Sequence, residues 1–445
     1  MKTIIIGAGK VGFSIAQMLS YANHDVVVIE NNSERKQIVE ENLDVQTILG
    51  SGGSISILHE AGICDAQLLV AVTEYDELNM VACLLGKKLG VKKTVARVRN
   101  PEYVDNNQIS ADALGIDLVI NPEQVTAEMI GKLAEVPEAI NVDYYADGKV
   151  QMVEVQLTKD SPVAYKRLMD IKFPKPNLIV AILRNEKMII PRGQDQLKPN
   201  DLVFVLAETT NMVAIEKVLG KERIKTENVT ILGGGRIGFY LAKLLEKKGY
   251  TVKLIEKSIE VCKEISQKLS NTLVLQGDGS DISLLEEEEV GQADFFVAVT
   301  NDDKVNLLVS IIAKHLGAKR TIAQIRRTEY VPLVEKVGID VAVSPRLLTA
   351  GAILRFIRKG DIVSVSLIGG AKAEMIELIA QSHSKVTGKP LKNLNFPKDA
   401  IIGAVVRDNN VIVPTGMDII NPHDRVIVFA LPKAIAKVEE FFLQK

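Results

Sequence analysis

Short apolar runs alternate along this chain with stretches of helical character, and the alternation occurs twice. The run from Thr3 to Ile6 leads directly into a glycine-rich turn, and the run from Val229 to Leu232 does the same in the second half. Each half contains six such runs separated by helical stretches, a pattern that predicts a parallel sheet with helices on both faces. The apolar runs are far shorter than the roughly 20 residues that a membrane-spanning helix needs.

The correspondence between the halves extends well beyond the glycine turns, so the chain contains an internal repeat. The further matched segments are Val45 to Leu49 with Thr272 to Leu275, Gly50 to Gly53 with Gly277 to Ser280, Leu69 to Glu74 with Phe296 to Asn301, and Thr94 to Tyr103 with Thr321 to Tyr330. Each predicted sheet is followed by a polar residue and a proline, Asn121-Pro122 and Ser344-Pro345, which is typical of a helix start.

A different pattern follows each predicted sheet. Residues Asn141 to Ala207 and Ile362 to Leu431 contain strand-like runs and turn residues but no glycine fingerprint. The predicted fold class is therefore α/β, with tandem Rossmann-like, doubly wound parallel sheets that are each followed by a small α+β lobe. We place the four domains at residues 1–136, 137–223, 224–359 and 360–445.

The two glycine turns have the spacing of a dinucleotide-binding fingerprint. Gly7 to Gly12 reads Gly-Ala-Gly-Lys-Val-Gly, and Gly233 to Gly238 reads Gly-Gly-Gly-Arg-Ile-Gly. In this fingerprint the first glycine permits a tight turn, the second lets a pyrophosphate approach the backbone, and the third lets the helix pack on the sheet. Glu30 and Glu256 stand at equal distances after the two loops, where a carboxylate accepts ribose hydroxyls and favours NAD or an adenine nucleotide over NADP.

Residues at the carboxyl edges of both predicted sheets are candidates for nucleotide contact. They are Gly7, Gly9, Lys10, Val11, Gly12, Glu30, Ser51, Thr73 and Arg97 in the first half, and Gly233, Gly235, Arg236, Ile237, Gly238, Glu256, Asp278 and Thr300 in the second. For Lys10 and Arg236 the alternatives are a phosphate contact or a solvated cation at a helix start. Asp278 either contacts a base or ribose or stabilises its own turn, and Lys257 slightly weakens the exclusion of a 2′-phosphate by Glu256.

Three arginines, Arg97, Arg99 and Arg326, follow the fifth predicted strand of their halves. They could meet phosphate or a neighbouring subunit, and the alternative is a surface ion pair. For the acids Asp76, Glu77, Asp302 and Asp303 we favour a simpler role, which is to complement the dipole of the following helix.

Composition narrows the functional classes. Fifty-six acidic against 54 basic side chains give a net charge of −2, which disfavours nucleic acid as a partner. The odd number of cysteines, Cys64, Cys83 and Cys262, favours buried fillers in a reducing cytoplasm over disulfides or a metal site. The chain opens at once on a strand and a glycine loop, so we expect no signal peptide. Its histidines are scattered, and no recognisable catalytic constellation is present, so we expect no enzyme.

The order of these motifs resembles an RCK (regulator of K⁺ conductance, or KTN) domain. The resemblance rests on the glycine loop, Glu30, Val-Ala-Val-Thr at Val70 to Thr73, Ala-Arg-Val-Arg at Ala96 to Arg99, and a small lobe containing Ile-Leu-Arg and Pro-Arg-Gly. Two such units in tandem resemble the TrkA-type regulatory subunits of Trk potassium-uptake systems.

That resemblance implies a cytoplasmic protein, peripheral on the inner face of the cell membrane, which assembles as a homo-oligomeric ring, expected to be a tetramer. It implies binding of NAD(H), ATP or ADP at the glycine loops and gating of a TrkH-type potassium-translocating membrane subunit. The family's Gly-Asp turn is intact at Gly277-Asp278 and altered at Gly50-Ser51, so we expect the two sites to be unequal in ligand.

The residues alone leave two alternatives open. One is an NAD-dependent oxidoreductase with a duplicated Rossmann core, and the other is a structural assembly in which the loops are vestigial and empty.

Overall fold

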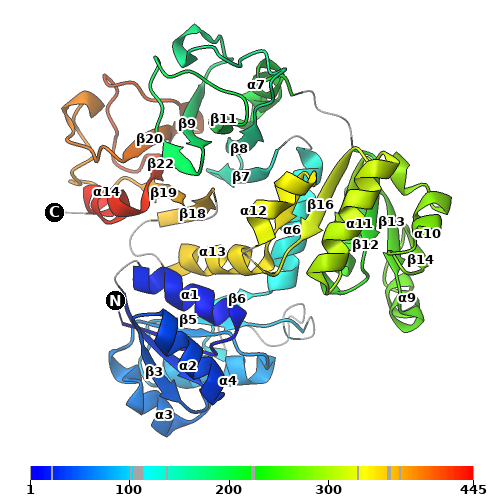
Figure 1. Cartoon of the computed structure of the whole chain (residues 1–445). Helices are drawn as coiled ribbons and strands as arrows, with labels where there is room; N and C mark the ends of the chain where they lie inside the picture. The colour runs from blue at the N-terminus through cyan, green and yellow to red at the C-terminus, as the bar shows by residue number, and fades with distance from the viewer. Residues whose placement is uncertain are drawn as a thin grey trace. The chain divides into compact units, whose positions relative to one another are not determined.

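The computed structural model describes residues 2–21, 24–100, 103, 114–136, 139–221, 226–327, 330–357, 362–369 and 372–443. They form two six-stranded parallel sheets and two five-stranded antiparallel sheets (Figure 1). The predicted fold class is confirmed. None of the described helices combines the length and the hydropathy that crossing a membrane requires.

The first parallel sheet has the strand order β3-β2-β1-β4-β5-β6. Its strands are β1 (Lys2–Ile6), β2 (Asp25–Glu30), β3 (Gln46–Leu49), β4 (Leu68–Ala71), β5 (Lys93–Arg97) and β6 (Leu118–Ile120). The helices are α1 (Lys10–Tyr21), α2 (Ser33–Asn42), α3 (Ile55–Glu60), α4 (Asp76–Lys88) and α6 (Pro122–Glu135). The order reverses between β1 and β4, and this switch point opens the crevice in which such sheets bind ligands.

The second parallel sheet repeats this order as β14-β13-β12-β15-β16-β17. Its strands are β12 (Asn228–Leu232), β13 (Thr251–Glu256), β14 (Thr272–Gln276), β15 (Phe295–Ala298), β16 (Arg320–Gln324) and β17 (Val341–Val343). The helices are α8 (Arg236–Lys247), α9 (Ile259–Ser266), α10 (Ile282–Glu287), α11 (Asp303–Leu316), α12 (Val331–Val334) and α13 (Pro345–Ile357).

The duplication extends to individual polar contacts. In the first half, Asp117 accepts hydrogen bonds from the Thr94 amide (2.7 Å) and hydroxyl (3.0 Å) and pairs with Lys87 of α4 at 2.7 Å. In the second half Asp340, Thr321 and Lys314 make the same three contacts. Both triads join the fifth strand to the fourth helix and to the approach of the sixth strand.

The antiparallel sheets form the two small lobes. The first has strands β7 (Asn141–Tyr145), β8 (Val150–Gln156), β9 (Asn177–Arg184), β10 (Lys187–Ile189) and β11 (Leu202–Glu208), followed by α7 (Met212–Val218). The second has β18 (Ile362–Ile368), β19 (Ala373–Ile379), β20 (Ala400–Arg407), β21 (Asn410–Ile412) and β22 (Arg425–Ala430), followed by α14 (Ile435–Phe442).

The two lobes share one hydrophobic core. Phe204 of the first lobe and Phe429 of the second belong to the same buried cluster. The sheets are in close contact at Gly403, where an added Cβ would lie 2.6 Å from Leu206 Cδ2 and 3.2 Å from Val180 Cγ1. A glycine opposite a valine therefore lets the two sheets pack face to face.

Two compact units divide the chain differently from its linear order. One contains residues 1–127, 325–328 and 344–357, and the other contains the remainder. In the first unit α13, a helix of the second half, packs beside α1 and β6 (Figure 1). Lys93 of β5 donates to the Phe356 carbonyl at 3.0 Å and lies 5.0 Å above the Phe356 ring. The predicted linear boundaries remain a prediction.

The cysteines do not all fit the prediction of buried fillers, because Cys64 is exposed and contacts His59 (Sγ to Nδ1, 3.7 Å). Cys83 and Cys262 are buried. Burial, followed by Asp117, raises the pKa of Cys83 to about 12. Burial and then Glu256 raise the pKa of Cys262.

We expect a thiol-specific disulfide reagent to modify only Cys64 rapidly in the folded chain, because the thiolate is the reactive form. Cys83 and Cys262 should react after unfolding in guanidinium, as followed by the absorbance of the released thiolate. Cys64→Ser should abolish the rapid phase, and a second rapid thiol in the folded protein would contradict the assignment.

Candidate functional site

The first glycine loop connects β1 to α1 with three different glycine environments. Gly7 has φ +97°, and its amide donates to the Ile29 carbonyl at 2.8 Å. An added Cβ at Gly12 would lie 1.9 Å from the Gly7 carbonyl oxygen, so α1 packs directly on the turn. An added Cβ at Gly9 would have no heavy atom of the described residues within 4 Å. This geometry fits the predicted division of roles, with open space where a pyrophosphate would approach.

The second loop has the same geometry. Gly233 has φ +108°, an added Cβ at Gly238 would lie 1.9 Å from the Gly233 carbonyl oxygen, and Gly235 faces open space. Gly235 is the N-cap of α8 and supplies no side-chain cap, so the first amides of this helix remain available to an anion. Arg236 begins α8 and is exposed, as Lys10 is at the start of α1.

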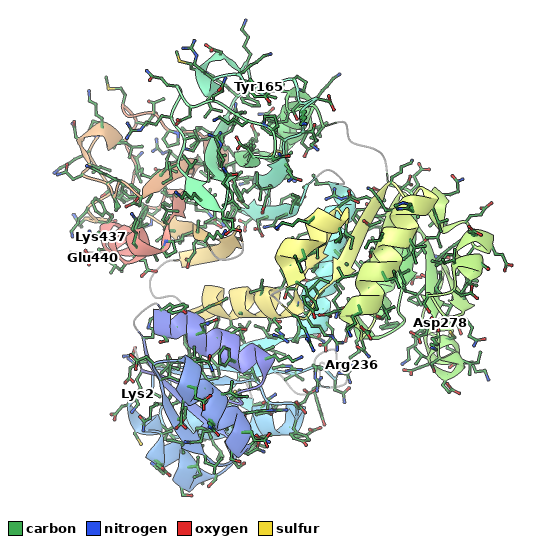
Figure 2. The ribbon with its side chains drawn as sticks, in the orientation of Figure 1. Lys2, Tyr165, Arg236, Asp278, Lys437 and Glu440 are labelled. Carbon is green, nitrogen blue, oxygen red and sulfur yellow. The ribbon has the colours of Figure 1, made fainter. Side chains whose placement is uncertain are left out.

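The apolar residue after the cation in each glycine loop packs into the start of the following helix. Ile237 is buried and Val11 is half-buried, so both lie in the packed first turn of their helices. Figure 2 labels Arg236, at the start of α8, and Asp278, in the turn after β14.

The two acids that were predicted to bind ribose hold the loops themselves. Glu30, which is 4% exposed, accepts the Ala8 amide at 2.5 Å and the Asn31 and Asn32 amides at 2.9 Å. Among the described residues, Glu256 accepts two backbone amides, those of Gly234 at 2.7 Å and Ser258 at 2.8 Å. A carboxylate offers about four lone-pair sites, so Glu256 keeps more capacity for a ribose than Glu30 does. Ribose contact remains a prediction for both.

Asp278 stabilises its own turn, which is one of the two roles predicted for it. One carboxylate oxygen accepts the Ser280 amide (3.0 Å) and hydroxyl (2.7 Å), and the other pairs with Lys257 at 2.7 Å. The Lys257 ammonium, followed by Ser280, holds the pKa of Asp278 well below its usual range. Lys257 pairs with Asp278 on the exposed surface, and its effect on a 2′-phosphate remains a prediction. In the first half Ser51 makes only a weaker bond, accepting the Gly53 amide at 3.3 Å.

In each half a buried asparagine connects the threonine after the fourth strand to the end of the fifth strand, a role that the sequence did not reveal. Asn79, in α4, accepts the Thr73 amide (2.9 Å) and hydroxyl (2.7 Å) and donates to the carbonyls of Thr73 (3.2 Å) and Arg97 (2.8 Å). Asn306 makes the same four bonds with Thr300 and Gln324. The available signal was an asparagine at the same spacing after each threonine. Thr73 and Thr300 are thereby fixed at the switch points.

The acids that follow the fourth strands differ between halves. Asp302 caps α11 by accepting the Lys304 amide at 2.8 Å, in agreement with the helix-dipole reading. Asp76 does not fit that reading alone, because its carboxylate accepts the amides of Arg99 and Asn100 at 2.8 Å and so ties α4 to the segment after β5.

Arg97 does not form a surface ion pair with any described residue, which was one of the alternatives predicted for it. Its Nε is sealed from water, and no hydrogen bond or ion pair to its side chain occurs within the described part of the chain. Burial and then Arg99 lower the pKa of Arg97. Arg99 itself donates to the Glu74 carbonyl at 2.8 Å.

The residues repeated between the small lobes form internal ion pairs. Arg184 pairs with the buried Asp201 at 2.6 Å, and Arg407 pairs with the buried Asp424 at 2.7 Å. Each arginine also donates to a loop carbonyl, that of Gln196 or Ile419. These matched positions therefore maintain the lobe fold.

Two Rossmann-type sheets with intact glycine loops, each followed by an antiparallel lobe, define a tandem RCK-type protein. The TrkA-N domain model matches residues 3–122 and 229–345, and the TrkA-C domain model matches residues 152–220 and 375–443. The chain belongs to the TrkA family of Trk-system potassium uptake proteins.

Full-length relatives support this assignment. The chain is 42% identical over 450 residues to Trk system potassium uptake protein TrkA homolog 2 of Methanosarcina mazei, covering 99% of this chain and 100% of that protein. It is 36% identical over 452 residues to Trk system potassium uptake protein TrkA of Vibrio alginolyticus, covering 99% and 98%.

Solved structures show the same fold. The GsuK channel bound to NAD aligns with a TM-score of 0.63 at 18% identity, covering 99% of this chain and 78% of that one. The GsuK RCK domain aligns with a TM-score of 0.63 at 19% identity, covering 99% and 94%.

Proposed function

We propose that this chain is the regulatory subunit of a Trk potassium-uptake system and binds NAD(H), ATP or ADP at its two glycine loops. It performs no catalysis in this proposal. Nucleotide exchange changes the conformation of a homo-oligomeric ring, a tetramer, which gates a TrkH-type potassium-translocating membrane subunit. The ring lies in the cytoplasm, peripheral on the inner face of the cell membrane.

The observation that carries the proposal is the environment of Gly9 and Gly235. Their neighbours in the loops have internal reasons to be glycine, a positive φ at the first position and a close carbonyl at the third. No described atom around Gly9 or Gly235 requires the absence of a Cβ. A glycine in open space is explained by the approach of a ligand, which argues against vestigial loops.

Regulation by nucleotide requires a difference in affinity between two conformations. A tenfold preference for one conformation supplies about 1.4 kcal/mol per site, and several sites in one ring add. Within the described residues no observation favours the oxidoreductase alternative, because the polar groups around the loops are engaged with loop and strand backbone.

The test is calorimetric titration of the full-length chain with NAD, NADH, ATP and ADP, followed by conductance of a co-reconstituted TrkH-type subunit. We expect at least one of these nucleotides to saturate and to shift the conductance. Failure of all four to bind would refute the proposal, and turnover of NADH with a second substrate would favour the oxidoreductase.

A further inference from the structure

Arg97 is half-buried, and no described residue pairs with its side chain. Its Nε is shielded from solvent and has no hydrogen-bond partner among the described residues, whereas its two terminal nitrogens are not both shielded and unpartnered. The charged groups that influence its pKa are Arg99, Glu123, Asp76 and Glu74. None of these acids hydrogen-bonds to it, and one oxygen of Glu123 is likewise buried and unpartnered. An incompletely paired cation is costly to retain, so a missing anion is the natural complement.

The position of Arg97 fits a phosphate chain that leaves the first glycine loop. β1 pairs with β4, and β4 pairs with β5, so Arg97 lies two strand spacings from Gly7, or about 10 Å across the carboxyl edge. Asn79 bonds to both Thr73 and the Arg97 carbonyl. Thr73 in turn lies against Gly7, where an added Cβ would be 3.1 Å from Thr73 Cα. Arg97 is thus held in a fixed place relative to the loop.

The second half contains the same asparagine and threonine contacts but has an uncharged side chain at the position of Arg97. Asn306 bonds to Thr300 and to the carbonyl of Gln324, which occupies the position of Arg97. Gln324 is 1% exposed, and its side-chain oxygen has no partner within the described part of the chain. The two sites therefore differ by one full positive charge at matched positions.

We propose that Arg97 makes the first site selective for nucleotides that end in a β- or γ-phosphate, as ADP and ATP do. Gln324 at the matched position leaves the second site without this selectivity. The inference rests on the proposed nucleotide binding and adds the ligand class of each site. Arginine suits the role because its planar donors engage a phosphate with two parallel hydrogen bonds.

The experiment measures each site separately in the full-length chain. Gly235→Val blocks the second loop for measurements on the first, and Gly9→Val does the reverse. ATP, ADP, AMP and NAD are titrated by calorimetry. In the Gly235→Val chain, Arg97→Gln should weaken ATP binding by about 10- to 100-fold, the effect of a hydrogen bond to a charged group, and change AMP binding by less than about threefold.

Arg97→Lys is the matched control, because it keeps the charge but loses the fork, and we expect an intermediate loss. Retained AMP binding shows that each variant is folded. An unchanged ratio of ATP to AMP affinity in Arg97→Gln would overturn the role of Arg97 while leaving nucleotide binding intact. Failure of the wild-type chain to bind any of the four nucleotides would instead refute the proposed function.

Discussion

Gly9→Val should abolish nucleotide binding at the first loop, with a loss of at least about 100-fold in affinity, and leave the fold intact. An added Cβ at this position would meet no described atom within 4 Å, so we expect the fold to accommodate a short side chain there. The same volume blocks the approach of a pyrophosphate to the loop amides and removes several charge-assisted hydrogen bonds, each worth about 1.5–3 kcal/mol. Calorimetry should show one site fewer, and Gly235→Val should remove the other.

Gly12→Ala is the matched control within the same loop. The added methyl group would lie 1.9 Å from the Gly7 carbonyl oxygen, so the first turn of α1 must move. We expect a loss of about 1–3 kcal/mol in the free energy of unfolding. Gly9→Val should leave the thermal midpoint within a degree or two. Wild-type affinity in both Gly9→Val and Gly235→Val would show that nucleotide binds elsewhere.

The sequence predicted those features of the fold that depend on residues close together along the chain. An apolar run, a glycine turn and an acid at the end of the next strand lie close together along the chain. They therefore located β1, α1 and Glu30 without knowledge of packing. The matched second copy made the same prediction for β12, α8 and Glu256.

The contacts that sequence did not reveal depend on residues that are distant along the chain. Nothing local indicates that α13 packs beside α1, or that Phe204 and Phe429 share a core. The acid at Glu30 was expected to face a ligand, yet three backbone amides occupy it, because a buried carboxylate must be satisfied. Tertiary structure determines hydrogen-bond partners, and the bond from Asn79 to the Arg97 carbonyl is another such case.

Arg425→Leu should destabilise the paired lobes by about 3 kcal/mol or more. Glu377 is 2% exposed and accepts Arg425 Nε at 2.7 Å and Nη2 at 2.6 Å. Arg425 also bonds to Asp147 of the first lobe, and Glu377 accepts the Ala146 amide at 3.2 Å, so one charge cluster joins the two lobes. Removing the arginine leaves a buried, unpaired carboxylate, which typically costs about 3–5 kcal/mol.

The shift in the denaturant midpoint of the full chain measures this cost, with Arg167→Leu as the matched control. Arg167 pairs with Asp170 at 2.8 Å on the exposed surface of the first lobe, and its loss should cost no more than about 1 kcal/mol. Combining Arg425→Leu with Glu377→Leu should recover most of the stability, because a packed apolar pair replaces the unpaired charge. If Arg425→Leu costs no more than the control, water or another cation must satisfy Glu377, and the lobes are held together by their apolar core alone.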